Sequence, residues 1–208
     1  MKIIAVIIIL NFITAQSEPF IPIASVLQAD TIWVDILQSQ IEWIGRKLTG
    51  EHSGTLRLKE GWIIMNDSTL IGGEFIFDMT SIKNTDIESP DWSLKLDNHL
   101  KSSDFFNVDS FPKAILEIKK NNSMSEENNL GSTYLVSAEL TIRGITHEIS
   151  LPYQIVKTDS TLSAIGRVDV DRTLYNIKYK SGTYFFDLGD KIIYDAFTIK
   201  FTVHTLPL

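Results

Sequence analysis

Two residues in the middle of the chain have the types and the spacing that could catalyse proton transfer. Asp97 stands two positions before His99, and in an extended chain residues i and i+2 share one face. A carboxylate beside an imidazole is the arrangement that a general base needs. It is also the common way to satisfy a buried imidazole, and no nucleophile stands nearby. The spacing therefore favours a structural role for the pair and leaves catalysis as the alternative.

The remaining histidines give a weaker indication of chemistry. His52, His147 and His204 are spread along the chain, without the short spacing to another His or a Cys that zinc ligands usually show. The chain has no cysteine, which excludes disulfides, thiolate metal sites and a cysteine nucleophile. A Gly-rich phosphate loop, a Gly-x-Ser-x-Gly motif and a His-Glu-x-x-His motif are also missing. We expect no catalytic residues, no metal site and no resident cofactor.

Alternation of apolar and polar residues predicts that these side chains stand on β-strands or their connections. Residues 134–143 carry an apolar side chain at every second position, and residues 145–155 resume the alternation after Gly144. The two runs and the glycine between them predict a hairpin. Residues 162–170 and 197–203 alternate in the same way. About eight such runs can be counted along the chain.

The connections are less regular than the strands. A turn is expected near Glu60 and Gly61, before a short strand at residues 62–65, and residues 73–79 form a further strand. Two segments, residues 92–100 and 104–109, could each form a helical turn. We therefore expect an all-β protein, an antiparallel eight-stranded barrel or a sandwich with a short helical turn or two, because closure hides the strand edges.

A membrane-spanning barrel is the alternative within this class. Such a barrel has outward apolar bands of about ten residues per strand with aromatic girdles. The polar residues that alternate here, such as Glu139 and Lys200, would then face the lumen. The loops are short and the chain ends at Leu208 without a terminal aromatic residue, which favours a soluble barrel.

The first residues have the pattern of an export signal. A basic start at Lys2 precedes an apolar run at residues 3–13, and small residues follow at Ala15 and Ser17. The run is shorter than the roughly 20 apolar residues that span a bilayer, although an uncleaved anchor is the alternative. We expect residues 1–17 to be a signal peptide, 18–29 a lead-in segment and 30–208 one domain of a periplasmic or secreted protein.

The net charge limits the classes of partner. The chain carries a formal charge of −7, and loss of Lys2 with the signal makes it −7 − 1 = −8. Nucleic acids and anionic membrane surfaces attract clustered Lys and Arg, so an acidic chain is a poor candidate for either. At 44% hydrophobic and 22% charged residues, the chain can bury a core without disulfides.

The aromatic residues carry more information than the polar ones. Phe105, Phe106 and Phe111 lie in a polar connection between strands, so they must be buried against the core or a ligand. An eight-stranded barrel is just wide enough to be filled by its own side chains or to hold one small ligand. Such a pocket would be lined by apolar and aromatic groups. Composition alone favours a plain core.

Four segments occur in a specific order along the chain. They are Gly50-Glu51-His52-Ser53-Gly54, residues 72–82, residues 99–112 and residues 140–147. Together they resemble the YceI-like family of exported polyisoprenoid-binding proteins with a lipocalin-like barrel, and the resemblance extends from about Thr31 to Pro207. It implies a long apolar cavity that takes an isoprenoid chain without covalent chemistry.

The chain departs from the family pattern at two places. The family has Arg-Asp before the His-Leu of the loop, whereas this chain has Leu96-Asp97-Asn98, so a headgroup contact through that arginine is not expected. The pattern Arg-x-x-(Phe/Tyr)-Gly-Ile occurs here from Arg172 with Asn176 in place of Gly. Asn tolerates the left-handed conformation better than most residues, so we expect the turn to be retained.

The resemblance therefore implies a binding protein that carries or sequesters a polyprenyl lipid or isoprenoid quinone. Its apolar lipid ligand would be its partner, with no nucleic acid, no membrane span after signal cleavage and a homodimer as an open possibility. The alternatives are an enzyme acting on such a lipid with Asp97 and His99 as base, and a dry-cored protein-interaction module. The residues expected to line the pocket are Trp43, Phe75, Phe77, His99, Phe105, Phe106, Phe111, Leu140, Ile142, Phe197 and Phe201.

Overall fold

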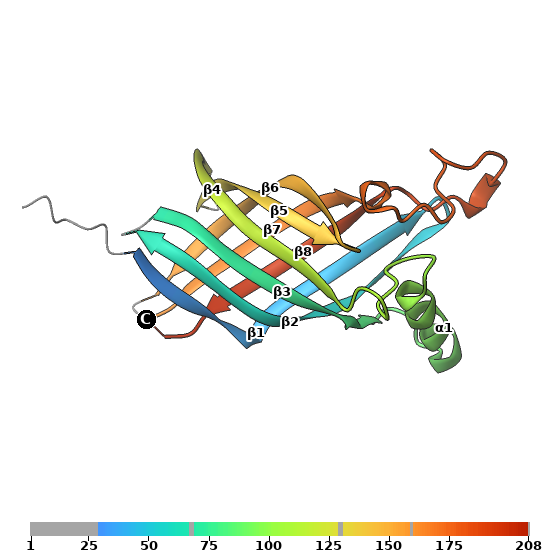
Figure 1. Ribbon diagram of the computed structural model, residues 1–208, viewed down its shortest axis with the longest axis horizontal. Coiled ribbons are helices and arrows are strands. Elements are labelled where there is room, and N and C mark those ends of the chain that lie inside the picture. The colour runs from blue at the N-terminus through green and yellow to red at the C-terminus, as the bar shows by residue number, and fades with distance from the viewer. Residues whose placement is uncertain (1–28, 67–68, 129–130, 159, 208) are drawn as a thin grey trace, which may run out of the picture.

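Eight antiparallel strands form a closed barrel in the computed structural model (Figure 1), which describes residues 29–66, 69–128, 131–158 and 160–207. Each strand pairs with its neighbours in sequence, and the last strand pairs with the first. The predicted all-β, eight-stranded barrel is confirmed. The strands are β1 (Ala29–Lys47), β2 (Gly50–Asn66), β3 (Thr69–Asn84), β4 (Lys113–Asn128), β5 (Gly131–Ile142), β6 (Ile145–Lys157), β7 (Leu162–Asp171) and β8 (Ala196–Thr205).

The N-terminal predictions concern residues that lie outside the described part of the chain. The signal peptide at residues 1–17 and all of the lead-in segment except Ala29 belong to this part. Both therefore remain predictions. No helix in the described part of the chain is long and apolar enough to cross a membrane.

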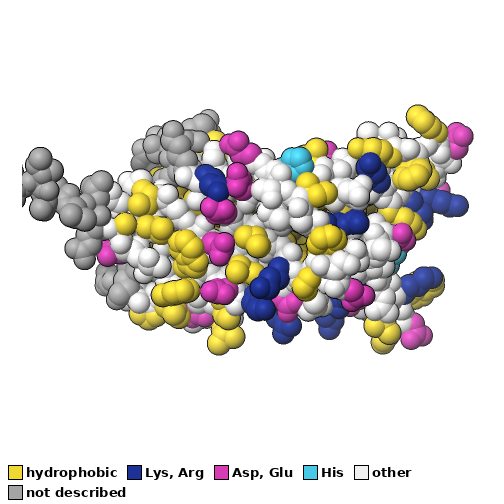
Figure 2. All heavy atoms as spheres, in the orientation of Figure 1, with side chains coloured by type: hydrophobic (Ala, Val, Ile, Leu, Met, Phe, Trp, Pro, Cys, Tyr) yellow, Lys and Arg dark blue, Asp and Glu magenta, His cyan; other side chains and the backbone are white. Residues whose placement is uncertain are grey.

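The period-two pattern places apolar side chains inside the barrel. On β5, Val136, Ala138 and Leu140 are buried, while the residues between them are less so. The predicted hairpin is confirmed: β5 and β6 are joined by Arg143 and Gly144, both with positive φ (53° and 71°). Two such residues in a two-residue connection match the right-handed twist of the strands. Outside, charged side chains are spread over the middle of the barrel (Figure 2).

The predicted turn at Glu60 and Gly61 is wrong. β2 continues through both residues, and its pairing with β3 shifts register between Leu58 and Glu60. A Cβ at Gly61 would lie 3.1 Å from the Phe75 ring and 3.2 Å from Val34. The glycine therefore marks a close approach of side chains inside the barrel, and the local irregularity bends a long strand instead of ending it.

A helix covers one end of the barrel. α1 (Pro90–Lys101) follows β3 and lies at the end where β1 meets β2 (Figure 1). The predicted helical turn at residues 92–100 is thus part of a longer helix. The buried carboxylate of Asp97 accepts hydrogen bonds from Asn84 N (2.7 Å) and Asn84 Nδ2 (2.6 Å). This pair fastens α1 to the last residue of β3.

The connection from β7 to β8 lies at the same end of the barrel (Figure 1). It begins with the 3-10 turn η1 (Arg172–Tyr175) and contains a second one, η2 (Gly189–Lys191). Asn176 ends η1 with φ 59° and ψ 30°, in the left-handed region. The expectation that asparagine retains this turn is confirmed.

Candidate ligand-binding cavity

An elongated cavity of about 230 Å³ occupies the barrel interior. Every strand contributes side chains to its wall, and further residues come from α1, from the loop after it and from the β7–β8 connection. A single water needs only about 10–15 Å³ of such space. The barrel is therefore hollow along its axis, with room for a chain of many methylene-sized groups.

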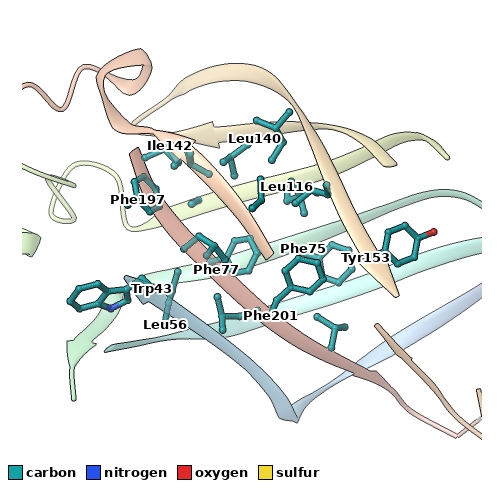
Figure 3. Close-up of a pocket in the computed structure, with 18 of the residues that line it drawn as sticks. Trp43, Leu56, Phe75, Phe77, Leu116, Leu140, Ile142, Tyr153, Phe197 and Phe201 are labelled. Carbon is teal, nitrogen blue, oxygen red and sulfur yellow. The ribbon is translucent and has the colours of Figure 1, made fainter. Parts of the chain in front are cut away.

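Most of the residues predicted to line a pocket do line this cavity. Figure 3 shows Phe75, Phe77 and Phe201 along it, with Trp43 and Tyr153 toward its opposite ends. The predicted residues found in the wall are Trp43, Phe75, Phe77, Phe105, Phe106, Leu140, Ile142, Phe197 and Phe201. The inward phase of the strands explains most of this placement, because many of the strand members stand beside a polar residue that points outward, such as Lys200 beside Phe201.

The other two predicted residues lie elsewhere. His99 packs between the rings of Phe105 and Tyr179, with centroid distances of 4.9 and 4.6 Å. Phe111 lies under the β5–β6 turn, where a Cβ at Gly144 would come within 3.2 Å of its ring. Neither belongs to the cavity wall. Of the phenylalanines in this loop, Phe105 and Phe106 reach the cavity, whereas Phe111 packs outside it, under the β5–β6 turn.

The proposed general-base pair does not form. Asp97 and His99 stand on α1, and on a helix residues two apart do not face each other. Asp97 is bonded to Asn84, whereas Nδ1 of His99 lies 4.0 Å from Asp104 Oδ2. The expectation of a shared face was wrong because it assumed an extended chain.

Burial governs the charge of His99. Desolvation lowers the pKa of His99, Asp104 partly opposes this effect and Lys180 adds to it. The neutral imidazole is therefore favoured in the folded protein. Its ring contacts with Phe105 and Tyr179 are consistent with a role in packing the loop.

Sequence reasoning missed most of the aliphatic wall and its few polar members. Strand alternation could have indicated residues such as Leu116 and Ile149, which were not singled out. The polar side chains in the wall are Tyr153, Ser163, Arg172, Tyr194 and Thr205. The pattern that this chain shares with the family from Arg172 onward singled out that residue, but it did not indicate that the side chain contacts the cavity.

Arg172 lies in the cavity wall beside the β7–β8 connection, and four of its five N–H donors are already used. Only 3% of its side chain is exposed. It donates from Nε to Tyr194 O (3.1 Å), from Nη1 to Ile177 O (2.8 Å), and from Nη2 to Ile193 O (2.9 Å) and Asp195 Oδ1 (3.3 Å). Burial lowers the pKa of Arg172, and nearby aspartates oppose this. The guanidinium fork thus anchors the β7–β8 connection.

The rest of the wall offers little charge to a ligand. Burial raises the pKa of Tyr153 to about 12, so its phenol stays protonated at neutral pH. The indole Nε1 of Trp43 is buried and has no hydrogen-bond partner among the described residues. The interior therefore suits an apolar molecule with at most a small polar group that can accept a hydrogen bond.

The remaining histidines are each bonded within the fold. His52 Nδ1 lies 2.8 Å from Asp86 Oδ2, His147 Nε2 lies 3.1 Å from Leu174 O, and Nδ1 of His204 lies 2.8 Å from a serine hydroxyl on β7. In the part of the chain that the structure describes, no three His, Asp or Glu side chains gather where they could hold a metal ion.

Comparison with known proteins agrees with this architecture. A family model described as the YceI-like domain matches residues 34–205. No curated protein matches the sequence. Among solved structures, BcnA from Burkholderia cenocepacia is similar with a TM-score of 0.63 and 17% identity, covering 82% of this chain and 98% of that chain.

Two further structures share the barrel. A polyisoprenoid-binding domain from Saccharophagus degradans, implicated in plant cell wall breakdown, has a TM-score of 0.58 and 14% identity, covering 85% of this chain and 98% of that one. The Campylobacter jejuni YceI protein has a TM-score of 0.52 and 17% identity, covering 72% and 82%. At these identities the likeness shows the fold alone.

Proposed function

The chain belongs to the YceI-like domain family, and from this premise we propose that it binds an isoprenoid-type lipid inside the barrel. The lipid would be a polyprenyl lipid or an isoprenoid quinone, carried or sequestered without covalent catalysis. The apolar, elongated cavity along the barrel axis carries this proposal. The signal-like sequence at residues 1–17 supports a periplasmic or secreted location.

The shape and lining of the cavity favour a chain over a compact polar ligand. Its wall extends from Ile63 in β2 and Leu162 at the start of β7 to Trp43 and Ile193, near α1. An apolar chain that buries roughly 400 Å² would gain about 10 kcal/mol at 25 cal/mol per Å². Association and ordering cost at least several kcal/mol of this. The remainder suits a carrier that must also release its lipid.

The polar groups of the wall limit the headgroup. Trp43 Nε1 is buried without a hydrogen-bond partner among the described residues, and four of the five N–H donors of Arg172 already bind the protein's own oxygen atoms. A quinone carbonyl or a single hydroxyl needs little more than one such donor. The S. degradans domain, described as polyisoprenoid-binding, supports the same class of ligand.

The two alternatives are weakened by specific observations. An enzyme using Asp97 and His99 as base requires a contact that the helix does not allow. A barrel filled by its own side chains would leave no space of about 230 Å³. The binding function therefore accounts best for the interior.

Native mass spectrometry of the mature protein, purified from the compartment to which it is exported, tests the proposal. The carrier should contain one apolar molecule per chain, and organic extraction should release a species of isoprenoid mass. Protein that is empty, and whose melting temperature is unchanged by added polyprenyl lipids and quinones, would contradict the proposal.

A further inference from the structure

A group of apolar side chains is exposed on the β7–β8 connection. Tyr184, Phe185 and Phe186 are consecutive and expose 44%, 49% and 87% of their surface. Tyr194 exposes 46% and Leu48, in the β1–β2 turn, exposes 63%. We call these five residues the aromatic tip. Contiguous exposed apolar groups usually mark a surface that binds something.

The loop that carries the aromatic tip is hydrogen-bonded to buried parts of the fold. The amides of Tyr184 and Phe185 donate to Ser181 O (3.2 and 3.0 Å), and Ser181 is fully buried. Thr183 Oγ1 donates to Asp195 Oδ2 (2.6 Å), and this aspartate also binds Arg172. The aromatic rings are therefore presented to solvent by an anchored loop.

The charge around the tip differs from that of the whole protein. Residues 47–50 and 178–194 contain four lysines and two aspartates, an excess of two positive charges in a chain of net charge −7. Lys178 Nζ lies 4.4 Å from the centre of the Tyr184 ring. Figure 2 shows Lys and Arg side chains beside hydrophobic ones at this end, with acidic side chains also present. This asymmetry would turn the tip toward an anionic surface.

The tip also adjoins the cavity. Tyr194 belongs to both, and it is the exposed member of the cavity wall among the described residues. Its amide donates to Arg46 O (2.9 Å). Nearby, Gly45 lines the cavity, and a Cβ there would meet no atom within 4 Å. The wall of the cavity thus reaches the surface beside the exposed aromatic rings.

We propose that the aromatic tip docks on the surface of a lipid bilayer, with Phe185 and Phe186 inserted among the headgroups. Aromatic side chains favour this interfacial region, and the lysines beside them favour anionic headgroups. Docking places the exposed end of the cavity against the membrane. The idea that lipid enters or leaves the cavity at this contact rests on the proposed function. The docking itself does not depend on that function.

Vesicle flotation of the mature protein tests the docking. The probes are phosphatidylcholine vesicles with and without phosphatidylglycerol, and the test variant carries both Phe185→Ser and Phe186→Ser. The matched control is Leu37→Ser, since Leu37 exposes 91% of its surface on β1. We expect wild type and control to bind, more tightly with phosphatidylglycerol, and the tip variant to bind at least tenfold more weakly with an unchanged melting temperature.

Three results would overturn the docking proposal. Wild-type protein that does not float with either vesicle would do so, as would equal losses in the tip variant and in Leu37→Ser. A dimer that the tip substitutions dissociate, without vesicle binding, would assign the surface to a second copy instead. Failure of the proposed function looks different, because a protein that docks through its tip but never contains lipid would refute only the carrier function.

Discussion

Filling the cavity from Ala164 should abolish lipid binding while preserving the fold. Ala164 lines the cavity from β7, between Ile155 of β6 and Val203 of β8. A tryptophan at this position would project its ring into the space that we assign to the ligand. An aromatic side chain buries about 150–250 Å², so the lipid would lose a comparable contact area. At about 25 cal/mol per Å² the loss is about 4–6 kcal/mol, on the order of a thousandfold or more in affinity.

The matched control for Ala164→Trp is Ala196→Trp. Ala196 is exposed at the start of β8, so the same residue is added outside the barrel. Binding is measured by competition with a fluorescent isoprenoid analogue, and folding by the melting temperature. We expect normal affinity for the control and no measurable binding for Ala164→Trp. The reasoning is refuted if Ala164→Trp melts as a folded barrel and binds the analogue as tightly as wild type.

Three further predictions concern the framework around the cavity. Gly54→Ala should lower the free energy of unfolding by about 3 kcal/mol, because the new Cβ would lie 2.0 Å from Lys83 O. The control Gly45→Ala has free space around its Cβ and should change the free energy of unfolding by less than about 1 kcal/mol. Equal effects of the two substitutions in urea unfolding would contradict this prediction. Arg172→Lys keeps the charge but not the guanidinium fork that binds three carbonyl oxygens, so it should lower the free energy of unfolding by about 3 kcal/mol. A loss below about 1 kcal/mol would show that the fork is dispensable. Burial lowers the pKa of His99 below its ordinary 6.5, so as the pH falls the unfolded chain takes up a proton at a higher pH than the folded protein does. The neutral, buried His99 therefore contributes its full share to stability above pH 6.5, and this contribution is lost as the pH falls below that value. His99→Gln should flatten that decline in urea unfolding at a series of pH values, and an unchanged decline would exclude His99 as its source.

The strands could be predicted because their pattern is local. Alternation on β5 and β6, with Gly144 between them, determines which face each side chain takes. The error at Gly61 shows the limit of this reasoning, because a glycine within a strand and a glycine in a turn look alike in sequence. What distinguishes them here is the approach of Phe75 and Val34 from other strands.

The candidate site was predictable in part for the same reason. Phe75 and Phe77 follow from strand phase, whereas Phe105 and Phe111 differ only in where the loop packs them. The misplacement of His99 had a local cue, since Pro90 at the start of α1 is typical of a first helical position. The anchoring role of Arg172 depends on carbonyl oxygens five to twenty-two residues away, which no local pattern reveals.

The fluorescence of Trp43 offers the most direct test of whether an isoprenoid occupies the cavity. Trp43 is 7% exposed and lines the cavity, whereas Trp92 on α1 is 62% exposed and does not. One variant keeps Trp43 and replaces the other three tryptophans by Phe, and its partner keeps only Trp92. On titration with an isoprenoid quinone, which quenches indole fluorescence on contact, we predict saturable quenching of Trp43 at one quinone per chain and little quenching of Trp92. Equal or non-saturating quenching of the two would contradict binding inside the barrel.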